Sequence, residues 1–180
     1  MDTVSFSLSQ LEETSALLHS LAPPTPQYCW PLLCQRTGTE VWVKHENHTA
    51  IGTFKVRGGL AFLDDLKRSQ TAGKVISHAS TTRIADGVAC RQPDELAFAM
   101  VFKNAERIVQ VTDDEVEAAM RAYFTDTHNV AEGAGALGLA ALLQEREKMR
   151  GRKVGIVLTG GNVDLDVFSR VLEGQNLSKI

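Results

Sequence analysis

Apolar and polar positions follow two kinds of pattern along this chain. Short apolar runs bounded by polar or glycine residues predict strands, and longer segments with apolar residues three or four apart predict helices. The expected strands cover residues 40–44, 74–77, 107–111 and 153–158. The expected helices cover residues 7–21, 53–67, 94–102, 112–124, 132–148 and 166–172. Strands that alternate with helices indicate an α/β fold with a mostly parallel sheet and flanking helices.

Boundary signals sharpen two of these helices. Ser7 or Ser9 can cap the first helix, with acidic residues expected in its first turn, and the prolines at 23, 24 and 26 end it. Thr112 and Glu115 form a capping-box pattern at the start of a later helix. We therefore divide the chain into an N-terminal helix, residues 1–22, and a single domain, residues 23–180.

Composition excludes several classes of protein. The chain has 180 residues, of which 43% are hydrophobic and 23% charged, as in a soluble globular domain. Its net charge of -3 gives no basic footprint for nucleic acid. It contains no apolar run as long as a membrane span and no signal-peptide pattern, which predicts a cytoplasmic protein that binds no membrane.

The three cysteines are Cys29, Cys34 and Cys90. An odd count without metal-ligand spacing indicates a reducing compartment and no disulfide framework. We interpret Cys29 and Cys34, which flank a Trp-Pro pair, as packing residues. The spacing of His45 and His48, without a carboxylate or cysteine partner, likewise favours loop structure over a metal site, so no metal is expected.

Lys55 has a setting that suits chemistry. It follows the strand at residues 40–44 and a polar, glycine-containing turn, and it falls in the first turn of the expected helix. The positive end of a helix dipole disfavours an ammonium there, so the neutral, nucleophilic amine is easier to reach. The alternative is an ordinary solvated lysine on a helix.

Residues 44–58 support the chemical interpretation, because they resemble the signature K-x-E-N-x-x-x-x-G-[ST]-F-K-x-R-G of the threonine/serine dehydratases. These are pyridoxal-phosphate enzymes of the tryptophan-synthase-beta type, fold type II. The resemblance implies pyridoxal 5'-phosphate as the cofactor, covalently held by Lys55 as the catalytic lysine, with Phe54 beside it.

Two later segments resemble further parts of the same family. Residues 132–138 fit the G-x-G-x-x-G dinucleotide pattern, but the next strand ends without an acidic residue for a ribose, so close helix packing is the stronger alternative. They also resemble the dehydratase element E-G/P-A-G-A, which would place Glu132 beside the cofactor ring. Residues 159–164 form either a simple strand-to-helix turn or the family element S-G-G-N-[VI]-D.

In that element the first hydroxyl, here Thr159, bonds the pyridine nitrogen, and Gly160 follows in the cofactor site. A neutral hydroxyl leaves the pyridine largely unprotonated and hence a weaker electron sink, which suits β-elimination.

A gap interrupts the resemblance. Residues 76–81 begin like the family's strand and asparagine loop, with Ser80 at the place of a catalytic serine, but Thr82 stands where the asparagine is expected. Residues 83–89 then resemble a segment from much further along the family sequence. Most of the small domain, including the glycine-rich loop that cradles the cofactor phosphate, would be missing at about residues 81–83.

Two functions follow as expectations. The first is a lyase that converts a hydroxy-amino acid, threonine or serine, into a 2-oxo acid and ammonia. The second is a non-catalytic truncated remnant that no longer holds the cofactor and associates with a full-length relative. The expected partners are a small amino-acid substrate and, as an open alternative, further copies of the chain in a homo-oligomer.

Overall fold

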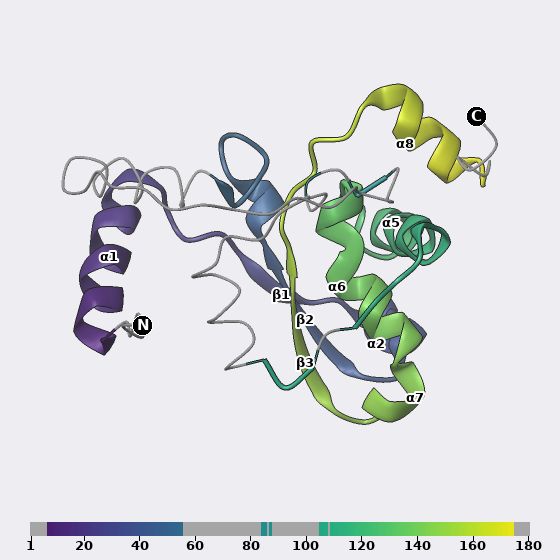
Figure 1. Ribbon diagram of the computed structural model, residues 1–180, viewed down its shortest axis with the longest axis horizontal. Helices are drawn as coiled ribbons and strands as arrows, with labels where there is room; N and C mark the ends of the chain where they lie inside the picture. The colour runs from purple at the N-terminus through teal and green to yellow at the C-terminus, as the bar shows by residue number, and fades with distance from the viewer. Residues whose placement is uncertain (1–6, 56–83, 86, 88–104, 108, 175–180) are drawn as a thin grey trace, which may run out of the picture. The chain divides into compact units, whose positions relative to one another are not determined.

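The computed structural model describes residues 7–55, 84–85, 87, 105–107 and 109–174 (Figure 1). The chain forms two compact units. The first comprises Met1–Pro24, Lys55–Ser80 and Cys90–Ile108. The second comprises Thr25–Phe54, Thr81–Ala89 and Val109–Ile180. No described helix is both long and apolar enough to cross a bilayer.

In the first unit the described structure is mainly helix α1, Leu8–Leu21. Ser7 caps it, because its Oγ accepts from the N–H of Gln10 at 3.2 Å and the Gln10 side chain accepts from the Ser7 N–H at 2.8 Å. The expected helix is confirmed, but its first turn holds no acidic residue because it begins at Leu8.

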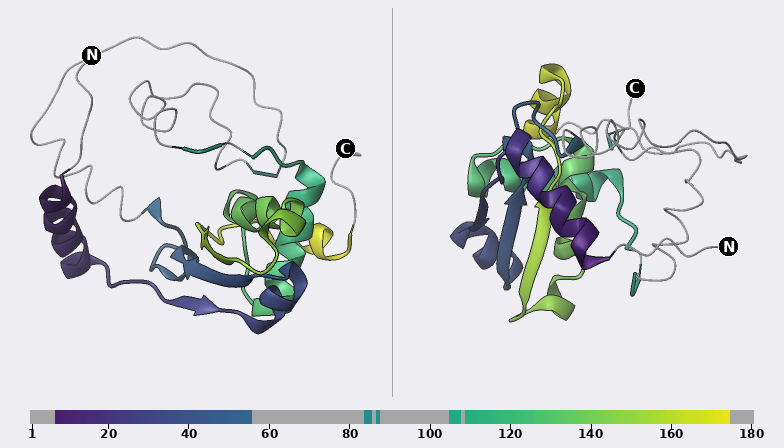
Figure 2. Two further views of the ribbon diagram at one scale, coloured as in Figure 1. Left: turned by 90° about the horizontal axis from the view of Figure 1, so that it is seen from below. Right: turned by 90° about the vertical axis from the view of Figure 1, so that its left-hand side faces the viewer.

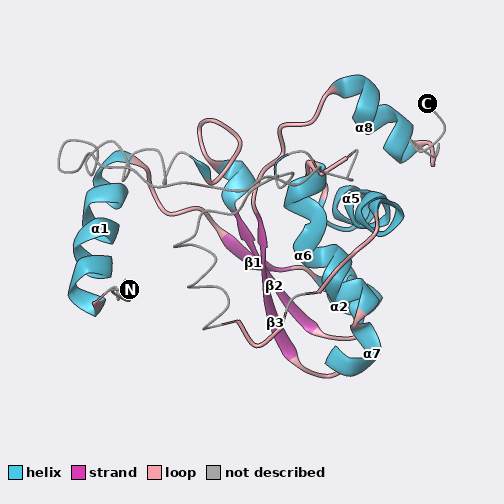
Figure 3. Cartoon of the chain, viewed as in Figure 1, coloured by secondary structure: helices cyan, strands magenta, loops and turns pink. Residues whose placement is uncertain are grey.

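The second unit contains a three-stranded sheet of β1 (Gln27–Cys29), β2 (Glu40–His45) and β3 (Lys153–Leu158), in the order β1-β2-β3 (Figure 3). Strand β1 runs antiparallel to β2, and β2 runs parallel to β3. The pairing begins at Glu40 with Lys153 and ends at His45 with Leu158, so the carboxyl ends of β2 and β3 meet at one edge. Both longer strands confirm the expectations from sequence; β1 was not predicted, because three residues carry too little pattern.

Helices α2 (Pro31–Thr37), α5 (Asp113–Thr127) and α6 (Gly133–Gln144) lie together on one side of the sheet (Figures 1 and 2). The side chains of β2 alternate, so that Val41 and Val43 are fully buried. They join a core formed with fully buried residues of the helices, among them Leu33, Met120, Tyr123 and Leu139.

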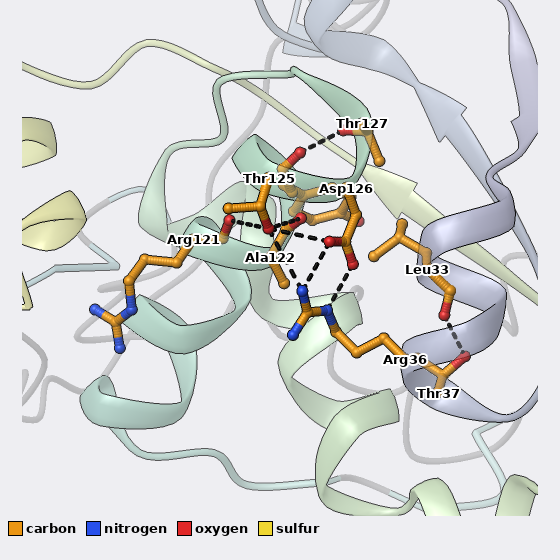
Figure 4. Close-up of polar contacts among 9 residues, drawn as sticks. Leu33, Arg36, Thr37, Arg121, Ala122, Thr125, Asp126 and Thr127 are labelled. Carbon is orange, nitrogen blue, oxygen red and sulfur yellow. Dashed lines mark hydrogen bonds and ion pairs between the residues drawn. The ribbon is translucent and has the colours of Figure 1, made fainter.

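An ion pair fastens α2 to α5 (Figure 4). The guanidinium of Arg36 donates from Nε and Nη2 to the two carboxylate oxygens of Asp126, at 2.5 Å and 2.7 Å. This fork is the strong form of a charge-assisted hydrogen bond, and it holds the pKa of Asp126 below its ordinary value. The contact fixes the last turn of α5, from which the chain leads toward the candidate site.

Two helices confirm their sequence signals with shifted ends. The capping box of Thr112 and Glu115 opens α5, which runs past the expected end at Phe124 and stops at His128 in a left-handed conformation with φ 56°. Helix α6 begins next to Glu132, as expected. The single helix predicted over 132–148 is wrong, because it breaks at Glu145 into α6 and α7 (Arg146–Met149).

The remaining expectations have mixed outcomes. The last helix is confirmed as α8, Leu165–Leu172. The strand expected at 107–111 is wrong for its described residues: the carbonyl of Gln110 accepts from the Gln144 side chain at 3.0 Å, not from a neighbouring strand. The strand at 74–77 and the helix at 94–102 lie outside the described residues, as does the helix at 53–67 beyond Lys55.

Candidate active site

The candidate site lies where β2 and β3 end. In parallel sheets this edge is the usual place for ligands, because loops from adjacent strands converge there. After His45, a short 3-10 helix, η1 (Glu46–His48), leads into the loop that ends at Phe54. After Leu158, the chain enters the turn at residues 159–162. The sequence marked these two segments as separate motifs.

The structure joins the two motifs through a series of bonds. The N–H of Phe54 donates to the carbonyl of Thr159 at 2.9 Å, and Thr53 forms an isolated β-bridge with Gly160. Two further hydrogen bonds hold the loop. The N–H of Gly161 donates to the Gly52 carbonyl at 3.0 Å, and the side-chain amide of Asn162 donates to the Ile51 carbonyl at 2.9 Å. The backbone is therefore fixed up to the residue before Lys55.

Lys55 itself is the first helical residue after this loop, and its side chain is exposed. Thr53 and Phe54 were expected inside the helix, but they precede it because their backbones bond to the turn at residues 159–162. The side chain of Phe54 is 46% exposed, so it does not belong to the core.

Glu132 reaches the same turn from the start of α6. Its N–H donates to the carbonyl of Gly160 at 3.1 Å. A Cβ added to Gly160 would collide with Glu132 Oε1 and would lie 3.2 Å from Thr53 Oγ1, so both polar groups border one point above Gly160. Of the residues expected to contact the cofactor, the structure therefore brings Glu132, Thr159 and Gly160 together beside Phe54.

The glycines of α6 serve close packing. A Cβ on Gly133 would collide with the carbonyl oxygen of Ile84, and one on Gly135 with the carbonyl oxygen of Gly160. One on Gly138 would touch the Ile156 side chain at 3.5 Å. Each glycine therefore faces protein atoms, which supports the packing interpretation over a dinucleotide site.

The segment that follows the expected gap docks beside Glu132. Besides the contact of Ile84 with Gly133, a Cβ on Gly87 would lie 3.0 Å from the Ala134 Cβ and 3.9 Å from Glu132 Oε1. The chain on the far side of the gap thus returns to the same edge of the sheet. Ser80, Thr82 and the junction lie outside the described residues, so the place of Ser80 stays a prediction.

His45, the last residue of β2, links Trp30 to Asn47 at the start of the lysine loop. It is fully buried, and its Nε2 accepts from Trp30 Nε1 at 2.8 Å, which fixes a neutral ring with the proton on Nδ1, 3.3 Å from Asn47 Oδ1. Burial, and to a smaller extent the charge of His48 stacked on it, lowers the pKa of His45. Within the described part of the chain no cluster of three or more metal-ligating side chains occurs.

Sequence reasoning missed Asn129, which clamps the turn after β2. Its Oδ1 accepts from Asn47 Nδ2 at 3.3 Å and lies 2.7 Å from His48 Nε2, while its own amide donates to the Thr127 carbonyl at 2.8 Å. The left-handed His128 turns the chain so that Asn129 reaches this place. Nothing in the local sequence links Asn129 to residues 47 and 48, so no signal could have found it.

Sequence reasoning also missed Thr53. Its hydroxyl is buried, and it finds no hydrogen-bond partner in the described structure. An unpaired buried hydroxyl is costly, so such a group beside Glu132 and Gly160 marks a place where a bound molecule can supply the missing partner. These residues fit the ring of the expected cofactor. The Gly161 N–H already bonds Gly52, so it is not free for a phosphate.

Comparison with known proteins gives these residues a context. The chain is 34% identical over 111 residues to the L-threo-3-hydroxyaspartate ammonia-lyase of a Pseudomonas species, covering 62% of this chain and 35% of that protein. It is 38% identical over 89 residues to the L-threonine ammonia-lyase of Thermotoga maritima, covering 49% of this chain and 22% of that protein. This chain therefore spans about a third or less of the length of either relative.

The fold has counterparts among solved structures. The processed form of threonine deaminase isoform 2 from Solanum lycopersicum matches with a TM-score of 0.77 and 13% identity, covering 96% of this chain and 90% of that chain. This likeness confirms the expected α/β fold of type II pyridoxal-phosphate enzymes. The sequence profile described as "Pyridoxal-phosphate dependent enzyme" matches residues 61–160, more than half of the chain. The chain therefore belongs to this family of pyridoxal-phosphate dependent enzymes.

Proposed function

We propose that this chain carries the cofactor site of a pyridoxal-phosphate ammonia-lyase that acts on a hydroxy-amino acid, threonine, serine or 3-hydroxyaspartate. The observation that supports it best is the bond from Phe54 N–H to the carbonyl of Thr159. This bond joins the lysine loop to the turn that would meet the cofactor's pyridine ring. Both relatives named above are ammonia-lyases of such amino acids.

In this proposal each residue has a role. The amine of Lys55 would hold the cofactor and, with the substrate bound, would accept the proton from the substrate α-carbon. The Thr159 hydroxyl would donate to the cofactor's pyridine nitrogen, and Glu132, Phe54 and Gly160 would border its ring. Ser80 serves as a second proton-transferring group on the opposite face.

Pyridoxal phosphate, when bound, supplies the electron sink that stabilises charge at the α-carbon. A neutral hydroxyl at Thr159 would keep this sink moderate, which would suit loss of the β-hydroxyl. The products are then a 2-oxo acid and ammonia. The bond from the Phe54 N–H holds the backbone of Thr159 in place.

The test is to add pyridoxal phosphate to the purified chain, record the visible spectrum, reduce with borohydride and map the peptides. Trypsin does not cut after a modified lysine, so labelling of Lys55 would give the peptide of residues 45–57 in place of 45–55. We expect this longer peptide, and a retained chromophore that is lost in Lys55→Ala. Equal labelling of Lys55 and the exposed control Lys153 would overturn the proposal.

A second function rests on the short span of the chain relative to the two ammonia-lyases. A remnant without a complete phosphate cradle would lose several charge-assisted hydrogen bonds, each worth about 1.5–3 kcal/mol, and would no longer retain the cofactor. Such a chain would associate with a longer relative through its exposed sheet and helix surfaces. No chromophore at Lys55, together with co-elution with a full-length ammonia-lyase in size-exclusion chromatography, would favour this alternative.

A further inference from the structure

Cys29 and Cys34 lie in direct contact. Cys29 ends β1, Cys34 lies in α2, and their sulfur atoms are 3.5 Å apart, so that one thiol donates to the other. The N–H of Val41 in β2 donates to Cys34 Sγ at 3.3 Å and holds this sulfur in place. Both cysteines are partly exposed. The pair therefore forms a preorganised dithiol at the surface, which packing alone does not require.

We propose that Cys29 and Cys34 form a redox site that closes to a disulfide when it meets a small oxidant, a hydroperoxide or a low-molecular-weight disulfide. The sulfur atoms need to approach by only about 1.5 Å to reach the length of a disulfide bond. Cys29 is the last residue of β1, which among the described strands pairs with β2 alone, and its side chain is partly exposed.

The chemistry balances with either oxidant. With a hydroperoxide, one sulfur attacks the peroxide, the O–O bond breaks, and a sulfenic acid and an alcohol or water form. The second sulfur then displaces the hydroxyl as water. With a disulfide such as oxidised glutathione, one cysteine attacks it, forms a mixed disulfide and releases one glutathione thiol; the other cysteine then attacks the cysteine sulfur of the mixed disulfide and releases the second thiol. In both cases the two thiols lose two electrons and two protons to the oxidant.

The surroundings of the pair set its reactivity. Burial, followed by the hydrogen bond and charge of Cys34, raises the pKa of the Cys29 thiol. Glu40 raises it further, whereas Lys153 lowers it. Because the thiolate is the nucleophile, this site stays reduced near neutral pH until an oxidant accumulates, and it reacts faster as the pH rises.

Formation of the disulfide would affect the candidate site through Trp30, which lies between the two cysteines in the sequence. Its indole donates to His45, which contacts the turn before Lys55. A disulfide would enclose residues 30–33 in a small covalent ring and would restrict the place of this indole. The redox site is distinct from the cofactor site, and its test does not depend on activity.

The experiment uses the full chain, reduced, exposed to oxidised glutathione, alkylated and digested with trypsin. No lysine or arginine precedes Arg36, so the peptide of residues 1–36 contains both cysteines, whereas Cys90 falls in the peptide of residues 84–91. We expect the first peptide to be lighter by two hydrogen atoms and not alkylated, with Cys90 alkylated, and dithiothreitol to reverse the change. Persistent glutathione adducts, or a link to Cys90 or to another chain, would overturn the proposal.

Controls separate the folded geometry from mere proximity in sequence. Cys29→Ser and Cys34→Ser should each stop at a stable glutathione adduct, whereas Cys90→Ser should still form the internal disulfide. In urea the unfolded chain keeps the same short spacing between the two cysteines but loses their fixed contact. If the folded contact assists closure, the thiol–disulfide equilibrium constant should be about tenfold larger in the folded chain than in the unfolded chain. Equal constants in the folded and the unfolded chain would show that the fold prepares no site.

Discussion

The two ends of the parallel pair β2 and β3 share backbone hydrogen bonds but differ in the contacts added to them. At the amino ends, the N–H of Glu40 donates to the Arg152 carbonyl at 2.9 Å and that of Gly151 to the Gly38 carbonyl at 2.8 Å. The added contact is an exposed ion pair of 2.9 Å between Glu40 and Lys153, whose side chains are 47% and 68% exposed. At the carboxyl ends, the loop before Lys55 and the turn after Leu158 are joined by backbone hydrogen bonds and by the close approach of Glu132 to Gly160.

The difference teaches where this fold tolerates change. An exposed ion pair gains little, because water and salt screen it and the side chains lose freedom. At the carboxyl ends, by contrast, Gly133 and Gly135 lie against the carbonyl oxygens of Ile84 and Gly160, which are main-chain atoms that no side-chain rotation can move aside. The carboxyl ends therefore tolerate less change at these positions than the amino ends tolerate in the ion pair of Glu40 and Lys153.

The largest expected effect is that of Gly135→Ala. The new Cβ would collide with the carbonyl oxygen of Gly160, a main-chain atom that cannot turn away, which we expect to lower the free energy of unfolding by about 3 kcal/mol in urea denaturation. Gly155→Ala is the matched control, because a Cβ there meets nothing within 4 Å. Equal stability of the two variants would break the contrast between the ends.

Asn129→Ala removes the clamp on Asn47 and His48. We expect a loss of about 1–2 kcal/mol in the free energy of unfolding, because the groups of the turn lose their shared acceptor. Amide hydrogen exchange in residues 47–54 should become faster at the same time. Asn129→Asp keeps the acceptor oxygen but loses the amide that donates to the Thr127 carbonyl, so we expect protection between that of the wild type and that of the alanine variant. Exchange in Asn129→Ala as slow as in the wild type would show that Asn129 does not hold the turn.

The buried His45 predicts loss of stability in acid. Its pKa is lowered in the folded state, so below the ordinary value of 6.5 the unfolded chain takes up a proton first. The free energy of unfolding should then fall by up to about 1.4 kcal/mol for each pH unit between that value and the lowered pKa of His45 in the folded state, and no further below it. His45→Gln should give a flatter pH profile by urea denaturation, and parallel profiles would contradict the role assigned to His45.

The smallest expected effect is that of Lys153→Gln at the amino ends. It removes the ion pair with Glu40, but both groups stay in water, so we expect no measurable change in the urea midpoint. Salt screens this ion pair, but because the pair contributes little, its screening should leave the urea midpoint of the wild-type chain almost unchanged. A clear destabilisation by Lys153→Gln would mean that the amino ends are as tightly specified as the carboxyl ends.

Local patterns were enough to predict much of the fold. The strand at residues 153–158 and the capping box of Thr112 and Glu115 depend on neighbours in sequence, and both were found. The strand expected at 107–111 failed because a strand needs a partner, and here the Gln144 side chain takes the Gln110 carbonyl instead. The break at Glu145 carried no glycine or proline signal.

The candidate site was predictable only in its parts. The motifs around Lys55 and Thr159 stood out by resemblance, but their bonds to one another join segments more than a hundred positions apart. The same holds for Asn129 and for the unpaired hydroxyl of Thr53, whose surroundings come from three separate segments. Such contacts arise from tertiary structure, which no local pattern encodes.

The parallel pairing of β2 with β3 also affects how the chain can fold during synthesis. A ribosome must translate residues 46–152 after β2 has emerged before β3 exists to pair with it. Until then the inner edge of β2 is open, and closing so long a loop is slow. Until β3 is synthesised, the lysine loop of the nascent chain cannot form its bonds to the turn after Leu158. A pause or premature stop before Leu158 would leave the edge of β2 unpaired and prone to aggregation.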